Sequence, residues 1–411
     1  MESLLSAMRT ISAAQRDSDM KTKNSKNKQR KRKQSRRKRG FPFLTVIFLV
    51  GILGLVFCGG RFLLGEYFGN DEDEIASADG QQEGIYYYYE SLSPEEQALY
   101  DKILEGIKEC EADIEIGAAS PEDVKQIVQM IYAEHPEIFW SGEWRSVSIN
   151  GQMTISFEYQ YTASEIKDRQ AEIENSVTSF LEKAQGMESE YEKIKSVYEY
   201  ILDTVEYVAG CADNQNLYSS LVNHESICAG YTRGTQYLLQ RLGIQAIYVG
   251  GMADGNGGWG NHAWNIVRCG KNYYQVDSTF GDGFSDALNY DELKKSNIRN
   301  YAYLCRDDKA FAADHKWTDY ELPLPKCTTD DLNYYKLNGM YSSTYDESVD
   351  ENMKESVIAG ERVWIWQFGD SDSERETKLE EKYMDYLQEY SESNSMWHSY
   401  SEAVNLFVCG Y

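Results

Sequence analysis

The feature that most constrains this chain is a long uncharged apolar stretch that directly follows a strongly basic segment. No charged residue occurs from Phe41 to Gly60, and a helix of this length crosses a hydrocarbon core of about 30 Å at about 1.5 Å per residue. Twelve Lys and Arg residues lie between Lys21 and Arg39, and such a basic flank stays on the cytoplasmic side of a membrane. We therefore expect a transmembrane helix over residues 41–64, with the N-terminus in the cytoplasm and the later residues outside.

Two other interpretations of the apolar stretch fit the sequence less well. A cleaved signal peptide has an apolar core of only about 7–15 residues, and the small-residue pattern at residues 76–78 lies far beyond the stretch. A lipoprotein signal would use Cys58, but the bulky Phe57 directly precedes it. A signal anchor, which leaves a single-pass membrane protein, is the preferred interpretation.

Charge and cysteines are distributed unevenly along the chain. Residues 1–40 contain fourteen Lys and Arg against three Asp and Glu, whereas the remaining 371 residues contain 27 against 64. Because an acidic folded part repels phosphate, nucleic acid is not expected as a partner. Seven of the eight cysteines, all but Cys58, are expected outside the cell. Seven is odd, so at least one thiol stays unpaired within the chain, and the sequence leaves open whether the others form disulfides.

Local patterns predict the elements of the extracellular part. Ser93-Pro94 and Ser120-Pro121 are helix starts, and Asn150-Gly151 between two alternating runs predicts a hairpin. Cys228 begins an apolar-periodic run that stops at Gly243, which predicts another helix. Further helices are expected over about 164–185, 188–206 and 374–390, and strands over about 244–251, 262–268, 273–277, 362–368 and 403–408.

Cys228, His262 and Asp277 form a constellation that fits thiol chemistry. A thiol hydrolase or acyltransferase needs a nucleophilic thiolate, an imidazole that transfers protons, and an acid that fixes the tautomer of the imidazole. At the first position of a helix, unpaired N–H groups and the helix dipole favour a thiolate. The predicted helix start places Cys228 at such a position.

The geometry of the predicted hairpin tests whether His262 and Asp277 can meet. With a two-residue loop, Cys269-Gly270, the two residues lie directly opposite each other. With a four-residue loop, 269–272, the register shifts by two and both side chains stay on one face as diagonal neighbours. A loop of three or five residues would separate them, so spacing permits the pair without requiring it.

These residues also have ordinary structural interpretations. A cysteine at a helix start is often a small buried apolar residue, and a strand histidine is often a satisfied core group. The glycine-rich segment 253–260 lacks the lysine of a phosphate-binding loop and is expected to be a flexible lip beside the cleft. No metal-binding or cofactor motif occurs, so neither is expected. The other histidines have no suitably spaced partner and are expected to be structural or exposed: His135, His224, His315 and His398.

Three blocks of the sequence resemble the core of the transglutaminase-like superfamily: NQNLYSSLVNHESICAGYTRGTQYLLQRLGIQAIYVGG, NHAWNIV and YYQVDSTFGD. The resemblance implies Cys228 as the nucleophile, His262 as the base and Asp277 as the orienting acid. It also implies that Gln215 or Tyr218 helps to bind an oxyanion beside the Cys228 backbone N–H.

The resemblance extends over about residues 190–290 and has one departure. Phe280 stands where a Trp is usual in the family, so aromatic character is kept. The flanks YAEHPEIFW and HKWTDYELP resemble those of secreted or membrane-anchored bacterial members of the transglutaminase/protease-like cytokinesis type.

The expected fold is α+β: a papain-like transglutaminase core with an N-terminal helical and hairpin region and a small C-terminal α+β appendage, preceded by one transmembrane helix. The expected divisions are a basic cytoplasmic tail (1–40), the transmembrane helix (41–64), an acidic linker (65–84), the N-terminal region (85–187), the catalytic core (188–322) and the appendage (323–411).

Two functions follow from this organisation. The first is a membrane-anchored extracellular thiol enzyme that forms a thioester from an amide or peptide carbonyl and passes the acyl group to water or to an amine. Its partners would be protein or peptide substrates, some associated with the cell wall. The alternative is a catalytically inactive surface module that binds wall polymer or protein. An intact Cys, His and Asp favours the enzyme.

Overall fold

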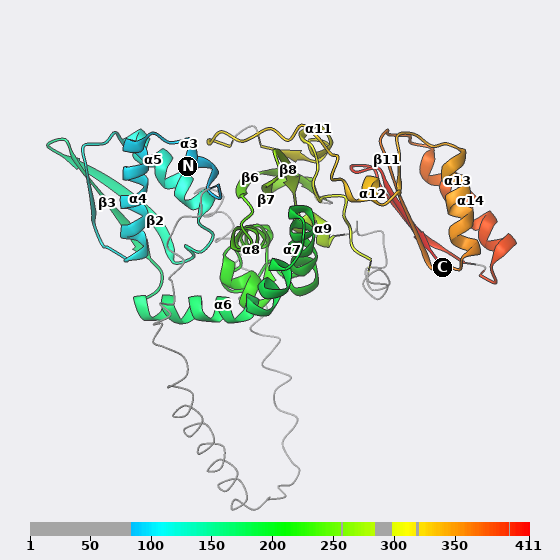
Figure 1. Cartoon of the computed structure of the whole chain (residues 1–411), viewed down its shortest axis with the longest axis horizontal. Coiled ribbons are helices and arrows are strands. Elements are labelled where there is room, and N and C mark those ends of the chain that lie inside the picture. The colour runs from blue at the N-terminus through cyan, green and yellow to red at the C-terminus, as the bar shows by residue number, and fades with distance from the viewer. Residues whose placement is uncertain (1–83, 256–257, 284–297, 318–319, 394) are drawn as a thin grey trace, which may run out of the picture. The chain divides into compact units, whose positions relative to one another are not determined.

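The computed structural model describes residues 84–255, 258–283, 298–317, 320–393 and 395–411 (Figure 1). All of them belong to one compact unit, residues 82–411. Among these described residues, no helix is both long enough and apolar enough to cross a membrane. The predicted tail and transmembrane helix, and the predicted linker as far as residue 83, lie outside the described residues.

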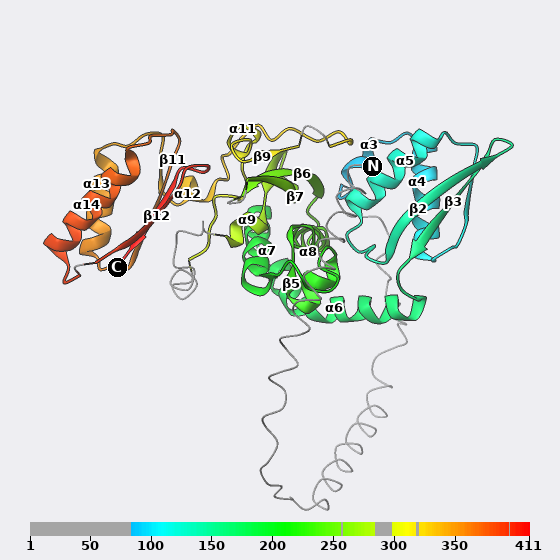
Figure 2. The same cartoon turned by 180° about the vertical axis from the view of Figure 1, so that it is seen from behind.

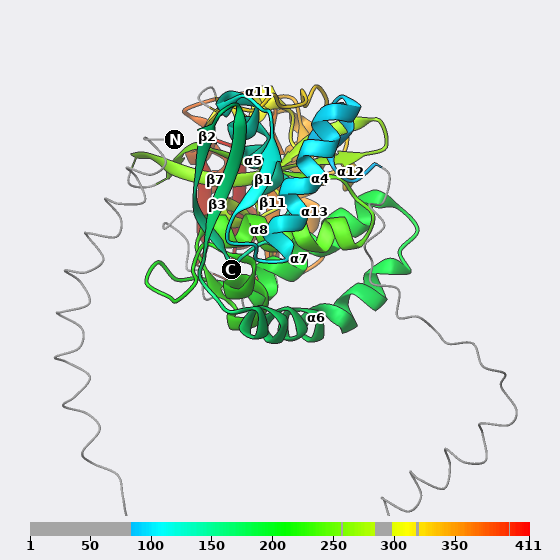
Figure 3. The ribbon, with the colours of Figure 1, turned by 90° about the vertical axis from the view of Figure 1, so that its left-hand side faces the viewer.

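The N-terminal part of the described chain contains an antiparallel sheet in the order β1-β3-β2, with α4 and α5 beside it (Figure 3). Its elements are α3 (Tyr87–Ser91), α4 (Pro94–Lys108), β1 (Ile114–Gly117), α5 (Pro121–Glu134), β2 (Ser141–Ile149) and β3 (Gln152–Tyr159). Ser93 and Ser120 cap α4 and α5 as predicted, because each hydroxyl accepts a hydrogen bond from a backbone N–H of the first turn. Asn150 and Gly151 form the predicted hairpin turn with φ angles of 53° and 78°.

Two long helices precede the central core and match their predicted ranges closely. They are α6 (Ala163–Gln185) and α7 (Glu190–Thr204). Thr162 and Glu165 form a capping box at the start of α6. Ser189 caps α7 through the Glu192 N–H.

The central core packs α8 against a four-stranded antiparallel sheet in the order β8-β7-β6-β9 (Figure 1, Figure 2). Its elements are β4 (Glu206–Tyr207), the π-helix η1 (Ser219–Asn223), β5 (Glu225–Ser226), α8 (Cys228–Arg241), β6 (Ala246–Gly255), β7 (Gly258–Cys269), β8 (Asn272–Val276), α9 (Ser278–Asp282), α11 (Asp308–Phe311) and β9 (His315–Lys316). Buried apolar side chains of α8 and the sheet, including Leu238, Val249 and Ile266, belong to one hydrophobic core. This core fixes α8 against the strands that carry the predicted site.

The β7–β8 register differs from the one implied by the two-residue loop Cys269-Gly270. The turn lies one residue later, at Gly270-Lys271, because Gly270 adopts the left-handed φ of 61°. Cys269 therefore pairs with Asn272. This is the register that the alternative four-residue loop implied. Extended by one residue, it places Asp277 on the same face as His262 and diagonal to it.

The glycine-rich segment expected to be a flexible lip is largely strand. Ala253 pairs with Gly260 and Gly255 pairs with Gly258, so β6 and β7 continue almost to the tip of their hairpin. The prediction of a loop over 253–260 was therefore wrong for the described residues of that segment. Antiparallel pairing there satisfies backbone groups that a loop would leave to solvent.

The C-terminal part contains a second sheet in the order β10-β11-β13-β12, with a second hydrophobic core between it and two helices. Its elements are α12 (Tyr334–Leu337), β10 (Tyr341–Ser342), α13 (Glu347–Ile358), β11 (Val363–Phe368), α14 (Arg375–Tyr390), β12 (Trp397–Ser401) and β13 (Leu406–Gly410). The predicted strand over 362–368, helix over 374–390 and final strand are confirmed, whereas β12 and α13 were not predicted. The described chain is α+β, as expected.

Candidate active site

Cys228 is the first residue of α8 and is half-buried. The preceding residue, Ile227, provides no side-chain cap, so the first N–H groups of α8 are not satisfied in this way. The helix start is held tightly, because a Cβ atom built on Gly230 would lie only 1.8 Å from Oγ of Ser226. The fold thus presents a thiol at the positive end of a firmly seated helix, as the sequence predicted.

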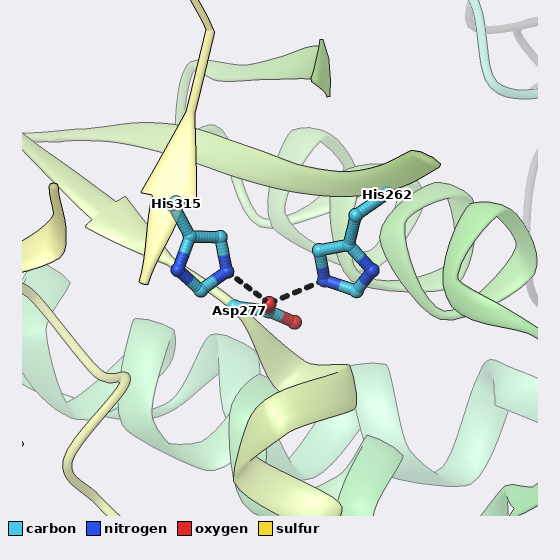
Figure 4. Close-up of side chains that lie close together, drawn as sticks. All are labelled: His262, Asp277 and His315. Atoms are coloured by element: carbon cyan, nitrogen blue, oxygen red, sulfur yellow. Dashed lines mark hydrogen bonds and ion pairs between the residues drawn. The ribbon is translucent and has the colours of Figure 1, made fainter. Parts of the chain in front are cut away.

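His262 lies on β7 and reaches both Asp277 and Cys228. Its Nε2 atom is 2.6 Å from Oδ2 of Asp277, and its side chain is 8% exposed. Cys228 lies near this ring, because its thiol is among the groups that raise the pKa of His262. Because Asp277 occupies Nε2, Nδ1 is the ring nitrogen left for another partner, and it points away from Asp277 in Figure 4.

Asp277 combines two tasks, since it caps α9 and binds imidazole. Its Oδ1 atom accepts hydrogen bonds from the N–H groups of Thr279 and Phe280, at 2.8 and 3.1 Å. Its Oδ2 atom lies 2.6 Å from His262 Nε2 and 3.0 Å from His315 Nε2 (Figure 4). The carboxylate is 1% exposed and accepts four hydrogen bonds. This environment fixes its orientation toward His262.

The electrostatics of the pair favour its charged form. Burial opposes ionisation of Asp277, but the charges and hydrogen bonds of His262 and His315 hold the pKa of that carboxyl well below its usual range. Burial likewise opposes the His262 imidazolium. The charge and hydrogen bond of Asp277, with smaller contributions from Cys228, nevertheless raise the pKa of His262 to about 10. His262 therefore holds its second proton at neutral pH.

His315 is a site residue that sequence reasoning missed. It was expected to lack a partner, but it lies on β9 between Asp277 and Asp314, with its Nδ1 atom 2.6 Å from Oδ1 of Asp314. The contact with Asp277 depends on the pairing of β9 with β6, which no local spacing reveals. The one signal in the sequence was the flank HKWTDYELP, which begins at His315.

Among the described residues, His262, Asp277 and His315 have potential metal-ligand atoms within 4.8 Å of one another. The observed separations are those of hydrogen bonds, at 2.6 and 3.0 Å. Two ligand atoms of a tetrahedral zinc ion, each about 2.0–2.2 Å from the metal, would lie roughly 3.3 Å apart. The cluster is therefore a hydrogen-bonded chain in this arrangement.

The two residues predicted to help bind the oxyanion are engaged elsewhere or exposed. The Tyr218 hydroxyl donates to Glu172 of α6, and the Arg169 guanidinium lies 4.3 Å from the Tyr218 ring centroid. Gln215 is exposed. Within the described part of the chain, no hydrogen bond joins either side chain to Cys228. The structure thus brings together three of the five predicted site residues.

The comparisons with known proteins agree with the resemblance described above. Residues 178–278 match the family model described as the transglutaminase-like superfamily, a range that includes all three clustered residues. No curated protein matches the chain.

Two solved structures are similar to parts of the chain. One is a cysteine protease candidate from Cytophaga hutchinsonii, 18% identical over 33% of this chain and 61% of that one, with a TM-score of 0.24. The other is described as a TGase, 19% identical over 39% of this chain and 50% of that one, with a TM-score of 0.25. The chain thus spans less than two thirds of either protein, and TM-scores this low add nothing to the argument. The family match identifies residues 178–278 of this chain as a transglutaminase-like domain.

Proposed function

We propose that this protein is a thiol enzyme that transfers acyl groups from amide or peptide carbonyls. In this proposal Cys228 is the nucleophile, His262 moves the proton, and Asp277 holds the His262 ring. The observation that carries the proposal is the hydrogen bond between His262 Nε2 and Asp277 Oδ2, next to the Cys228 thiol at the start of α8.

The reaction begins with attack of the Cys228 thiolate on the carbonyl carbon. A C–S bond forms, and the C–N bond of the amide breaks as the His262 imidazolium gives its proton to the leaving ammonia or amine. The product is a thioester on Cys228. Water or a primary amine then attacks the thioester, gives its proton to His262, and releases the acyl group and the thiolate.

The raised pKa of His262 supports its role as the proton donor. At neutral pH the ring carries the proton that the leaving nitrogen needs. The buried carboxylate of Asp277 stabilises that imidazolium and keeps Nε2 turned away from the thiol. Nδ1 then faces the reacting atoms.

We further propose that the enzyme is anchored by residues 41–64, with its N-terminus in the cytoplasm and its catalytic part outside the cell. The basic segment before that stretch and the acidic composition after it support this topology. The substrates would then be proteins or peptides at the cell surface, including those attached to the wall. Nucleic acid is an unsuitable partner for so acidic a chain.

A thioester-trapping experiment tests the proposal. Wild-type protein and the Cys228→Ser variant would be offered glutamine-containing proteins and peptides, with and without a primary amine, and the Cys228 peptide would be analysed by mass spectrometry. We expect an acyl adduct on wild type, none on the variant, and an amine-linked product if the acceptor is an amine. A wild-type protein that forms no adduct with any such substrate would favour the alternative, an inactive surface module that binds wall polymer or protein.

A further inference from the structure

His315 lies between two buried carboxylates. Its side chain is fully buried, with Nε2 3.0 Å from Oδ2 of Asp277 and Nδ1 2.6 Å from Oδ1 of Asp314. The side chain of Asp314 is only 6% exposed. Its second oxygen accepts a hydrogen bond of 2.6 Å from the hydroxyl of Tyr303. The polar chain therefore continues past Asp277, from His315 through Asp314 to Tyr303.

The two carboxylate contacts determine how many protons His315 carries. A neutral imidazole has one N–H, so its other nitrogen would direct a lone pair at a carboxylate oxygen. Only the imidazolium donates to both Asp277 and Asp314. Although burial opposes the charge, the hydrogen bonds and charges of these two carboxylates raise the pKa of His315. Geometry and electrostatics thus agree on a doubly protonated ring.

The surroundings of His315 hold that ring in one orientation. Its charged neighbours are Asp277, Asp314 and the His262 ring, whose centroid is 5.5 Å away. Its remaining walls are aromatic, with ring centroids between 3.9 and 5.9 Å from that of His315: Phe280, Phe311, Trp264 and Tyr303. Phe311 stacks on it directly. These walls exclude water and leave the two carboxylates as the ring's polar partners.

We propose that His315 is a positioning residue, whose imidazolium fixes Oδ2 of Asp277 against His262 and partly offsets the Asp277 charge. The backbone supports the same arrangement, because the Asp277 N–H donates to the carbonyl oxygen of Tyr303, the residue whose hydroxyl binds Asp314. This inference rests on the proposed function, since positioning matters only if Cys228 and His262 react.

The proposal has an electrostatic consequence for Cys228. Of the two charges, that of His315 is nearer to the Asp277–His262 contact, because His315 binds Asp277 through Nε2 and Asp314 through Nδ1, on the other side of the ring. Replacing His315 and Asp314 together leaves the net charge of the protein unchanged. The replacement still removes the positive charge of His315, which is the nearer of the two to His262. We therefore expect the acidic limb of the Cys228 alkylation profile to move to higher pH when the pair is replaced.

The test compares full-length wild type with a paired variant, His315→Gln with Asp314→Asn. A neutral pair replaces an ion pair, so no buried carboxylate is left without a cation. His398→Gln is the matched control, because His398 also lies near carboxylates, 3.3 Å from Glu376, but in the C-terminal part. Iodoacetamide alkylation of Cys228 would be followed against pH by mass spectrometry. Thermal unfolding would report whether each variant is folded.

We expect the paired variant to fold, to show the upward shift in the alkylation profile, and to lose about 10–100-fold in acyl transfer. The control should match wild type. If wild-type Cys228 reacts faster than free cysteine but the folded paired variant has the same profile, the positioning role is wrong and the proposed function stands. If wild-type Cys228 reacts no faster than free cysteine, the proposed function fails and the positioning role fails with it.

A second measurement needs no variant to fold. In wild-type protein labelled with ¹⁵N in its five histidines, the nitrogen shifts distinguish a neutral ring from an imidazolium. We expect one buried histidine to have both ring nitrogens protonated throughout the neutral pH range. Nuclear Overhauser effects to the neighbouring aromatic rings would assign it to His315. A neutral His315 at pH 7 would overturn the proposal even if the paired variant does not fold.

Discussion

Replacing Asp277 by Asn changes only one oxygen, yet it should remove most of the activity. The amide oxygen can still accept the hydrogen bonds of Thr279 and Phe280, because Asn caps a helix about as well as Asp. The amide nitrogen, however, would face Nε2 of His262 and Nε2 of His315, both of which now donate to Oδ2. The NH₂ group of the new Asn would then face the Nε2–H groups of His262 and His315, and none of these groups can accept a hydrogen bond from another.

The size of the loss in turnover follows from the change of tautomer that the Asn side chain imposes on His262. Turning a bare Nε2 toward the amide puts the ring proton on Nδ1, the side that faces Cys228, where it can no longer accept the thiol proton. Loss of the correct tautomer costs about 10⁴-fold in turnover, or about 5.5 kcal/mol at about 1.4 kcal/mol per tenfold. Removing one charge from a buried ion pair should also lower the free energy of unfolding by about 3–5 kcal/mol.

The assay compares Asp277→Asn with Asp307→Asn, a matched control at another helix start. Asp307 caps α11 by accepting a 2.7 Å hydrogen bond from the Ala310 N–H, and it binds no imidazole among the described residues. Single-turnover acyl transfer and thermal unfolding would be measured on both variants. The control should stay close to wild type in both. Turnover of a folded Asp277→Asn variant within about tenfold of wild type would refute the assignment of Asp277.

Four further outcomes are expected. Cys228→Ser should abolish acyl transfer but leave the melting temperature nearly unchanged, and retained transfer would contradict the nucleophile. Acyl transfer should fall as pH rises through about 10, where the His262 imidazolium loses its proton. The contribution of the His262 charge to the free energy of unfolding is complete below about pH 6.5 and is lost as pH rises through about 10. Gly230→Ala should cost about 1–3 kcal/mol of folding free energy and reduce activity, because the new methyl group meets Ser226, and calorimetry would show this. Ser93→Ala should cost about 1 kcal/mol through loss of the α4 cap, with activity unchanged in the same transfer assay.

Much of the fold could be predicted because its signals are local. Ser93, Ser120 and the Asn150-Gly151 turn mark boundaries by chemistry confined to a few residues, and the structure has those boundaries. The same holds for Cys228 at the start of α8. Residues with special backbone or capping preferences predict element boundaries from the local sequence, without knowledge of distant contacts.

The register of the β7–β8 hairpin was harder to predict from the sequence. The sequence Cys269-Gly270-Lys271 allows either of two neighbouring turns, and the choice depends on which residues adopt left-handed φ angles. The register of the two-residue loop and that of the four-residue loop differ by two residues, so both keep His262 and Asp277 on one face of the sheet. The candidate pair was therefore predictable even though its exact alignment was not.

Contacts between distant segments were not predictable from local patterns. His315 reaches Asp277 because β9 pairs with β6, and His315 is 62 residues beyond its strand partner Ala253. The Tyr218 side chain turns toward Glu172 on α6, a contact set by how two helical segments pack. Neither arrangement leaves a periodic signal in the sequence.

The central claim is that Cys228 and His262 act as a reactive thiolate–imidazolium pair, and selective alkylation tests it most directly. The chain supplies its own reference thiols, because Cys110, Cys211 and Cys269 are also half-buried and burial raises the pKa of each. Wild-type protein would be treated with iodoacetamide near pH 6.5, well below the ordinary cysteine pKa of about 8.5. We predict labelling of Cys228 about tenfold or more faster than of the reference thiols, and loss of that preference in His262→Ala. Labelling of Cys228 no faster than the other three thiols would contradict the account.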